Sequence, residues 1–143
     1  MTEDWQVRAA TSDDRPWLEE TLREELRTNS YFHGVPAKLV AGLSASVAAP
    51  TDEWRTDVVT TADEDHEPAG WVIYREVPAL TIAHAYVEDS FRGLGAWRAL
   101  REHVGLKRGQ LVNVILASPQ AMSLARKVYM AKHNWGQILG WLT

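Results

Sequence analysis

The sequence predicts a single α/β domain in which helices cover a central sheet of about six strands. The chain has 143 residues, a length that fits one domain with one core. Strand-like and helix-like periodicities follow one another in the order β-α-α-β-β-β-α-β-α-β. No repeat, low-complexity tract or interior linker interrupts residues 1–143, so we expect one domain over the whole chain.

The first third of the chain predicts one strand and two helices. Residues 4–10 have the composition of a short strand, and residues 16–29 place Leu18 and Leu22 at helical spacing. Pro16 suits the first turn of that helix. Residues 34–50 start after a glycine and stop at a proline, which predicts a second and more apolar helix.

The middle of the chain predicts an antiparallel meander of three strands. Residues 56–62 are rich in valine and threonine, as strands are. A polar turn, "DEDHEPAG", separates them from a second predicted strand at 70–76, and a tight "VPA" turn precedes a third at 80–87.

The last third predicts two helices that alternate with two strands. A helix is expected over 94–109, with Gly109 just past its end. A buried strand follows at 111–117 and a helix at 118–134, the latter with a serine cap and a proline at its first position. A short last strand is expected at 136–143.

The composition excludes several classes of site. Zero cysteines exclude disulfides, a thiolate nucleophile and cysteine-ligated zinc. The five histidines show no pair at ligand spacing on one element, so no metal site is expected. No run of about 18 apolar residues predicts a membrane span, and the acidic N-terminus lacks the apolar core of a signal peptide. A cytoplasmic location is therefore expected.

The charges divide the chain into an acidic and a basic part. Eighteen of the 19 acidic residues and 7 of the 15 basic residues precede Phe91, which leaves residues 91–143 with one acid and eight basic residues. The two parts could neutralise each other on packing, or the basic part could face an anionic ligand. A nucleic acid is an unlikely ligand, because the arginines are spread over two helices and no nucleic-acid motif is present.

The stretch "FRGLGAWRAL", residues 91–100, has the features of a phosphate-binding turn. Unpaired N–H groups at a helix start hold phosphate well. Gly93 and Gly95 let the backbone approach a ligand, and Arg92 adds a charge-assisted donor. The pattern suits a diphosphate, although a glycine turn needed only for helix–sheet packing would look the same. A Walker-type loop is excluded, because no Gly-Lys-Ser/Thr follows.

The order of elements and this motif together resemble the GNAT superfamily of acyl-CoA-dependent N-acyltransferases. "YVEDSFRGLGAWRAL" is similar to the family's strand end, Arg/Gln-x-x-Gly-x-Gly/Ala turn and following helix. "ARKVYMAKHNW" is similar to the family's late helix, and "VRAATSDDRPWLEETL" to its first strand and helix. The resemblance implies a mixed, mostly antiparallel central sheet with helices on both faces.

The resemblance also implies a function and a set of residues. The function is transfer of an acyl group, expected to be acetyl, from coenzyme A to a primary amine by direct attack. Backbone groups at the strand end would meet the pantetheine arm, amides of the turn would meet the pyrophosphate, and Tyr129 would protonate the leaving thiolate. The implied acetyl-CoA contacts are Tyr86, Val87, Arg92, Gly93, Leu94, Gly95, Ala96, Trp97 and Ser118, the last in place of an asparagine usual in the family.

A general base must take a proton from the attacking amine. His84, Glu88 and Asp89 are the candidates near the expected cleft. His84 shares one strand face with Tyr86, since alternate residues point the same way. It is also the candidate whose ordinary pKa lies near neutrality. We expect His84 or Glu88 to act, although a lone strand histidine is more often structural.

Trp97 departs from the family's pattern, which has Gly or Ala at this position. We expect its ring to fill space above the small residues Ala83 and Ala85, leaving the N–H groups free. In the alternative, its indole lies across the phosphate site. The protein would then be a non-catalytic GNAT-fold module for protein interaction or structure.

Two further expectations concern partners. Only about ten residues follow the late helix, where many family members have two strands, so a second copy could complete the sheet edge as a homodimer. The acidic residues 1–90 suit a cationic amine, whose site would be shaped by the first two helices and the "DEDHEP" turn.

Overall fold

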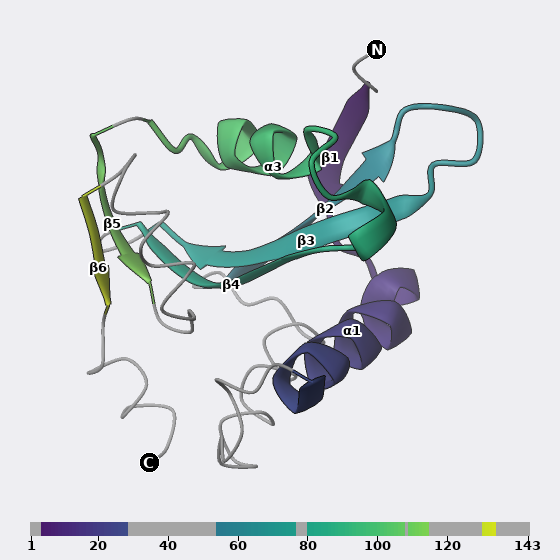
Figure 1. The fold of residues 1–143 in the computed structure, drawn as a ribbon, viewed down its shortest axis with the longest axis horizontal. Coiled ribbons are helices and arrows are strands. Elements are labelled where there is room, and N and C mark those ends of the chain that lie inside the picture. The colour runs from purple at the N-terminus through teal and green to yellow at the C-terminus, as the bar shows by residue number, and fades with distance from the viewer. Residues whose placement is uncertain (1–3, 29–53, 77–79, 108, 115–129, 134–143) are drawn as a thin grey trace.

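A computed structural model describes residues 4–28, 54–76, 80–107, 109–114 and 130–133 (Figure 1). Six strands, two α-helices and two short 3-10 helices lie within these ranges. In chain order they are β1 (Trp5–Ala9), η1 (Ser12–Asp14), α1 (Arg15–Thr28), β2 (Arg55–Thr61), β3 (Pro68–Arg75), β4 (Thr81–Val87), η3 (Asp89–Phe91), α3 (Ala96–Val104), β5 (Leu111–Val114) and β6 (Met130–His133).

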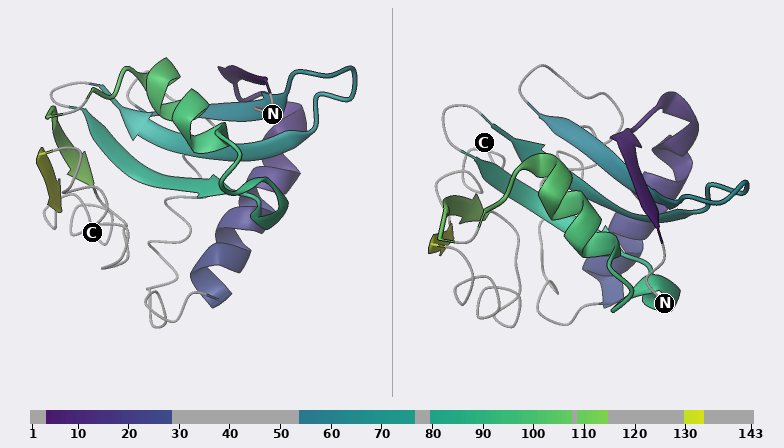
Figure 2. Two further views of the ribbon diagram at one scale, coloured as in Figure 1. Left: turned by 45° about the horizontal axis from the view of Figure 1, so that its top comes forward. Right: turned by 90° about the horizontal axis from the view of Figure 1, so that it is seen from above.

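The strands form one mixed sheet in the order β1-β2-β3-β4-β5-β6. The first four strands are antiparallel neighbours, and β4-β5 and β5-β6 pair in parallel. The two views of Figure 2 show β5 and β6 at the end of the molecule opposite the β2–β3 hairpin. The predicted fold class, a mostly antiparallel α/β sheet, is confirmed.

The two helices cover opposite faces of this sheet, as predicted (Figure 1). On one face α3 buries Leu100 against a cluster that includes Val59, Val72 and Tyr74. On the other face α1 buries Leu18 and Leu22 completely. These long apolar side chains exclude water from both faces, which is the main source of stability for such a layered fold.

The ends of α3 differ from the sequence prediction. The helix ends at Val104 rather than beside Gly109, because Gly105 adopts a left-handed backbone with φ of 88°. Its N–H donates to the carbonyls of Arg101 and Glu102, and the N–H of Leu106 also donates to Arg101. These bonds satisfy the last carbonyls of the helix, so an earlier glycine than expected stops it.

The predicted helix over 118–134 is wrong for its last residues. Met130–His133 forms β6, paired in register with the whole of β5. This four-residue stretch contains no β-branched residue, so its neighbour strand decides its conformation rather than local propensity. The predicted helix over 34–50, the "VPA" turn and the last strand over 136–143 lie outside the described residues.

Within the described residues, strands β4 and β5 share a short paired segment. Thr81 pairs with Asn113 and Ile82 with Val114. Ala83 is an extra residue on β4, since the register with β3 shifts between Ile73 and Tyr74. Among the described residues, the part of β4 after this bulge pairs with β3 alone. One edge of Ala83–Val87 is therefore free of strand pairing from β5 within this part of the chain.

Candidate acyl-CoA site

A glycine turn connects the end of β4 to the start of α3. Gly93 and Gly95 have left-handed backbones, with φ of 77° and 100°. A Cβ at Gly93 would meet open space, whereas one at Gly95 would lie 3.4 Å from Nε1 of Trp5. The turn thus needs glycine for its conformation at both positions, and at Gly95 a neighbouring ring adds a tight contact.

Trp5 on β1 anchors this turn, and the sequence did not single it out. Its indole Nε1 donates to the carbonyl of Leu94 at 3.0 Å. Its ring also meets Phe91 edge-on, with 5.7 Å between ring centroids. The first strand therefore fixes both sides of the glycine turn, which reduces the ordering that ligand binding would otherwise require.

The start of α3 offers amide groups that have no acceptor within the helix itself. The first bond of the helix runs from the N–H of Ala99 to the carbonyl of Gly95, at 3.0 Å. The N–H groups of Ala96, Trp97 and Arg98 thus precede any acceptor within the helix. Such groups carry partial positive charge and suit a phosphate.

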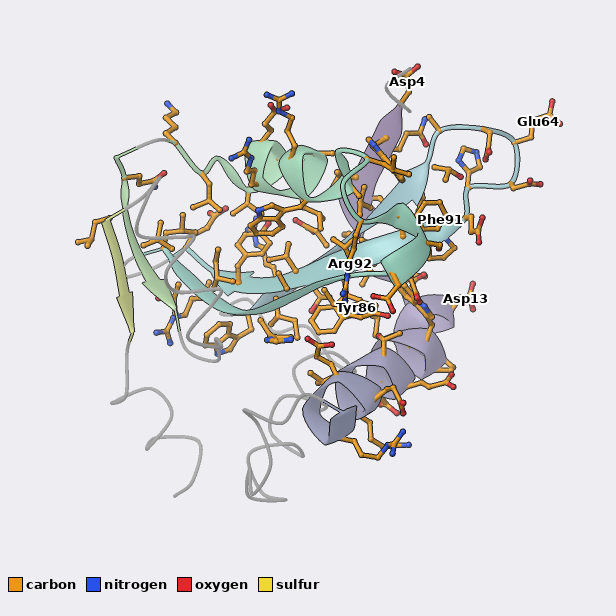
Figure 3. All side chains as sticks on the ribbon, in the orientation of Figure 1. Asp4, Asp13, Glu64, Tyr86, Phe91 and Arg92 are labelled. Carbon is orange, nitrogen blue, oxygen red and sulfur yellow. The ribbon has the colours of Figure 1, made fainter. Side chains whose placement is uncertain are left out.

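Arg92 lies at the mouth of the turn, exposed to solvent (Figure 3). Its Nε donates to the carbonyl of Val87 at 3.0 Å, and one of its terminal nitrogens lies 2.7 Å from Asp89. The Val87 carbonyl predicted to face pantetheine is therefore engaged by Arg92 in this structure. The guanidinium brings positive charge beside the predicted phosphate site, partly offset by Asp89.

Trp97 is half-buried and packs against the core beneath α3. Ala85, on the same face of the sheet, also packs against that core. The side chain of Ala83 is outside the described residues, so the expectation that Trp97 fills the space above both alanines stays a prediction.

A row of three α1 residues contacts polar groups on the opposite face of the sheet. Trp17, Thr21 and Glu25 are spaced four apart, which places them on one stripe of the helix. Nε1 of the buried Trp71 donates to Oγ1 of Thr21 at 2.8 Å, and Thr21 in turn donates to the carbonyl of Trp17. The sequence signal for this stripe was its i, i+4 spacing, beside the more obvious leucine stripe.

Glu88 accepts two hydrogen bonds from aromatic residues. Nε1 of Trp17 donates to Oε1 at 3.2 Å, and the hydroxyl of Tyr86 donates to Oε2 at 3.0 Å. Burial, followed by this bond to a carboxylate, raises the pKa of Tyr86 to about 12. Glu88 is thus held by one donor from α1 and one from β4, and Tyr86 lies between the sheet and α1 (Figure 3).

His84 lies on the same strand face as Tyr86, as predicted, and is 6% exposed. Its ring is 5.7 Å from the ring of Trp71. Its Nε2 lies 3.9 Å from Oε1 of Glu25, the third residue of the α1 stripe. The structure thus gives His84 a carboxylate neighbour that the sequence did not identify.

The predicted site residues fall into two groups. Those of β4, the turn and α3 form one continuous path: His84, Tyr86, Val87, Glu88, Arg92, Gly93, Leu94, Gly95, Ala96 and Trp97. Ser118 and Tyr129 lie outside the described residues, so their roles stay predictions. No cluster of metal-ligating side chains occurs within the described ranges. In the same part of the chain, no helix is long and apolar enough to cross a membrane.

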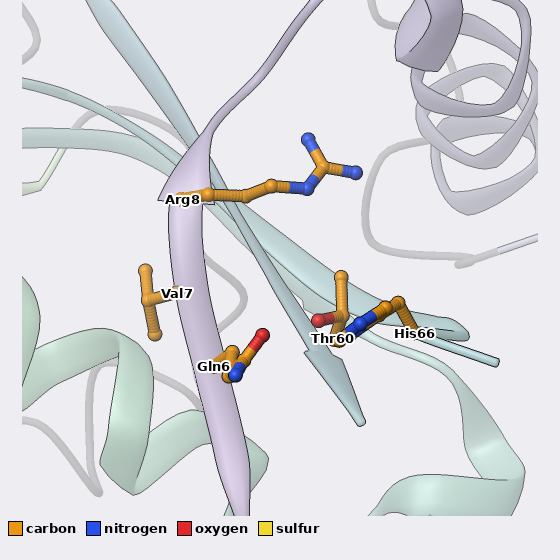
Figure 4. Close-up of a pocket in the computed structure, with 5 residues that line it drawn as sticks. All are labelled: Gln6, Val7, Arg8, Thr60 and His66. Carbon is orange, nitrogen blue, oxygen red and sulfur yellow. The ribbon is translucent and has the colours of Figure 1, made fainter. Parts of the chain in front are cut away.

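Within the described part of the chain, two pockets lie near the first strand. One, of about 500 Å³, is bordered by Phe91 and by acidic residues that include Asp63 and Glu67 of the "DEDHEP" turn. That turn therefore lies at the phosphate end of β4 rather than beside His84. The other pocket, of about 480 Å³, contains none of the predicted site residues (Figure 4). It is lined by Gln6, Val7, Arg8, Thr60 and His66.

Comparison with known proteins shows which fold this chain has. No protein-family model matches the sequence, and no curated protein matches it. Solved structures do match. A possible acetyltransferase from Clostridium difficile has a TM-score of 0.61 at 13% identity, over 91% of this chain and 93% of its own.

Two enzymes with stated substrates are also similar. A GNAT phosphinothricin acetyltransferase from Sinorhizobium meliloti, in complex with AcCoA, has a TM-score of 0.56 at 18% identity, over 89% of this chain and 74% of its own. A Vibrio cholerae spermidine N-acetyltransferase chimera has a TM-score of 0.51 at 15% identity, over 86% of this chain and 78% of its own. At such identities the likeness shows the fold, which is that of GNAT acetyltransferases.

Proposed function

We propose that this chain, which has the GNAT fold, transfers an acetyl group from acetyl-CoA to a primary amine. The observation that carries the proposal is the path of β4. Within the described residues, the strand pairs with β5 as far as Ile82, bulges at Ala83 and leads through η3 into the glycine turn that opens α3. A free strand edge suits the amides of an extended ligand, and a helix start suits its phosphates. Acetyl-CoA presents these two chemistries in that order.

The residues on this path fit such a ligand. Left-handed glycines let backbone N–H groups face a diphosphate, and Arg92 adds charge at the same place. Trp5 holds the turn through Leu94 and packs on Phe91. Trp97 has part of its surface buried against the core, which supports a cofactor site that remains open.

The reaction depends mainly on positioning. The amine nitrogen attacks the thioester carbonyl carbon, the C–S bond breaks, and the thiolate leaves. Tyr129, assigned by its place in the family's late motif, would give the thiolate a proton. A tyrosine hydroxyl can act as this acid because it keeps its proton at neutral pH.

A cationic amine is the acceptor class that the charges favour. Glu25 on α1 and Glu88, which follows β4, both lie on the α1 side of the sheet, and residues 1–90 are strongly acidic. One of the similar structures is named for spermidine, a polyamine. A panel of amines with release of free thiol as the readout tests this class. Equal rates on neutral and polycationic amines would contradict it.

Titration calorimetry with acetyl-CoA tests the function itself. We expect micromolar binding by the wild type and its loss in Gly95→Glu, because that side chain would press on Trp5 and place a carboxylate at the phosphate site. Gly109→Glu is the matched control. Gly109 also has a positive φ, of 80°, but it faces open space beyond the end of α3. This variant should bind as the wild type does.

Absence of binding in a folded wild type would overturn the proposal. The non-catalytic alternative would then stand, with Trp97 closing the site. Loss of binding in both glycine variants would instead indicate a general effect of backbone strain, and it would not support a phosphate site at Gly95.

A further inference from the structure

If the proposed function holds, the path of β4 indicates which of the two candidate bases, His84 or Glu88, lies nearer to the reacting atoms. The phosphates of acetyl-CoA would lie at the turn after Asp89, so the thioester lies toward the other end of the free edge, near the bulge at Ala83. His84 adjoins that bulge. Glu88 is four residues further on, about 13 Å along an extended strand, at the phosphate end.

The contacts of the two side chains also favour His84 over Glu88 as the base. Both carboxylate oxygens of Glu88 accept hydrogen bonds, from Trp17 and from Tyr86. A base occupied by two donors is a poorer proton acceptor than one beside a negative charge. The imidazole Nε2 of His84 is 3.9 Å from a carboxylate oxygen of Glu25.

We propose that His84 takes the proton of the acceptor amine and that Glu25 is its positioning residue. Glu25 lies on α1, whose stripe is fixed to the sheet at its other two positions by Trp17 and Thr21. The carboxylate is therefore carried on a rigid helix, with 23% of its side chain exposed. At 3.9 Å the two groups are within ion-pair range but beyond hydrogen-bond distance, so the charge of Glu25 stabilises the imidazolium that proton transfer creates.

The protons balance in this scheme. An ammonium acceptor gives its first proton to His84, and the free amine then attacks the thioester. The second N–H proton leaves as the amide forms, while the departing thiolate gains one proton. The net release is one proton, which His84 returns to solvent before the next turnover.

In the described part of the chain, charged and titratable groups face His84 from α1 and from the end of β4. Glu25 faces it from α1, and Tyr86 and then Glu88 follow on its own face of β4. On β3, His84 pairs with Ile73 and its ring contacts that of Trp71, and both of these residues are uncharged. Of these groups, Glu25 is the carboxylate paired with the imidazole, so its removal is the informative change.

Nuclear magnetic resonance of the imidazole tests the pairing without any acceptor. His84 is assigned by comparison with His84→Gln, and its proton binding is followed against pH in wild type and Glu25→Gln. We expect the pH at which the His84 imidazole is half-protonated, the midpoint, to fall by about one unit in Glu25→Gln. The variant removes the negative charge that favours the protonated imidazole in the wild type. Glu24→Gln is the matched control, since Glu24 is on the same helix but exposed and bridged to Arg27. It should leave the midpoint unchanged.

Kinetics with the best acceptor of the amine panel test the role in catalysis. Glu25→Gln should lower kcat more than tenfold at neutral pH, with little change in KM for acetyl-CoA, and move the acidic limb of the pH profile downward. Glu25→Asp should recover part of the loss. The inference would be overturned if Glu25→Gln left the protonation midpoint of His84 unchanged, or if it did not shift the pH dependence of kcat.

These outcomes are distinct from failure of the proposed function. Calorimetry on the same variants reports whether acetyl-CoA binds, which the inference requires to persist in Glu25→Gln and His84→Gln. Wild-type binding without turnover on any amine, while the imidazole midpoint still depends on Glu25, would assign the pair a structural role and overturn the inference. Thermal unfolding of each variant identifies losses that come only from stability.

Discussion

The indole N–H of Trp5 donates to the carbonyl of Leu94 across 89 positions of sequence, at 3.0 Å. This bond joins the first strand to the turn that begins α3. It therefore makes the shape of a candidate cofactor site depend on the edge strand β1, which itself pairs only with β2 in the described sheet.

Replacing Trp5 by phenylalanine should weaken acetyl-CoA binding. The variant keeps an aromatic ring against Phe91 and removes the hydrogen bond to Leu94. A net hydrogen bond is worth about 1 kcal/mol, so the Kd from calorimetry should rise roughly fivefold. Trp17→Phe is the control, because it loses a similar bond, to Glu88, on the other face of the sheet. A Kd that rises equally in both variants would contradict a specific role for Trp5.

Two tyrosines, the buried Tyr74 and the half-buried Tyr86, should make the protein less stable at high pH. Burial raises the pKa of Tyr86 to about 12, and burial and the bond to Asp57 raise that of Tyr74 further. An unfolded tyrosine loses its proton near pH 10, before the folded ones do. The free energy of unfolding should thus fall as pH rises above about 10, by roughly 1 kcal/mol per pH unit for each residue.

Urea unfolding at a series of alkaline pH values measures this slope. Tyr86→Phe should show a shallower decline than wild type, since it removes one of the two groups. The same decline in Tyr86→Phe and wild type would show that Tyr86 does not resist ionisation.

Asp14 should stabilise the start of α1, and this stabilisation should be lost at acidic pH. Its carboxylate accepts two hydrogen bonds from Arg8, at 2.7 and 2.9 Å, and one from the N–H of Thr11. The bonds to Arg8, and then those to Thr11, hold the pKa of Asp14 below its ordinary value despite burial. The stabilisation is therefore complete above about pH 4 and is lost as pH falls through the lowered pKa.

Asp14→Asn should cost about 1 to 2 kcal/mol at pH 7, with part of the ion pair discounted because Arg8 is partly exposed. Denaturant titration at pH 7 and at low pH measures the difference from wild type, which should shrink in acid. Asp13→Asn is the control, since Asp13 is an exposed neighbour. A constant difference at both pH values would mean that charge is not the source.

Gly70 should not tolerate alanine. A Cβ there would collide with the backbone carbonyl of Tyr86 and crowd Val87 on β4. Relief requires the two strands to separate, so Gly70→Ala should lower the free energy of unfolding by about 1 to 3 kcal/mol. It should also weaken acetyl-CoA binding, because Tyr86 and Val87 border the proposed path. Thermal unfolding of Gly70→Ala beside the wild type checks this, and equal stabilities of the two proteins would refute it.

Local patterns in the sequence predicted most of the described elements. The valine-rich run of β2 and the leucine stripe of α1 are dominated by short-range periodicity, and both were confirmed within a residue or two. Met130–His133 was assigned to a helix, because nothing in these four residues reveals that β5 lies beside them. The end of α3 was misplaced because two glycines, Gly105 and Gly109, both offered a stop and local spacing could not choose between them.

The site was predicted less completely than the fold. The glycine turn is a local motif, and its positive φ values confirm the turn conformation. Its partner Trp5, and the pairing of Glu25 with His84, join residues far apart in the chain, which a single sequence does not reveal. The cytoplasmic location and the homodimer stay predictions.

The short contact between β4 and β5 has a mechanical consequence. Within the described residues, the four antiparallel strands and the parallel pair β5-β6 are joined by two residue pairs, at Thr81 and Ile82. Among the strand pairings of the described residues this one has the fewest paired residues, so we expect separation of the sheet to cost least at this junction. A ligand bound along Ala83–Val87 would add contacts across the junction between β4 and β5 and so hold the two parts of the sheet together. Binding and resistance to unfolding would then rise together, so hydrogen exchange of β5 amides should slow as acetyl-CoA is added.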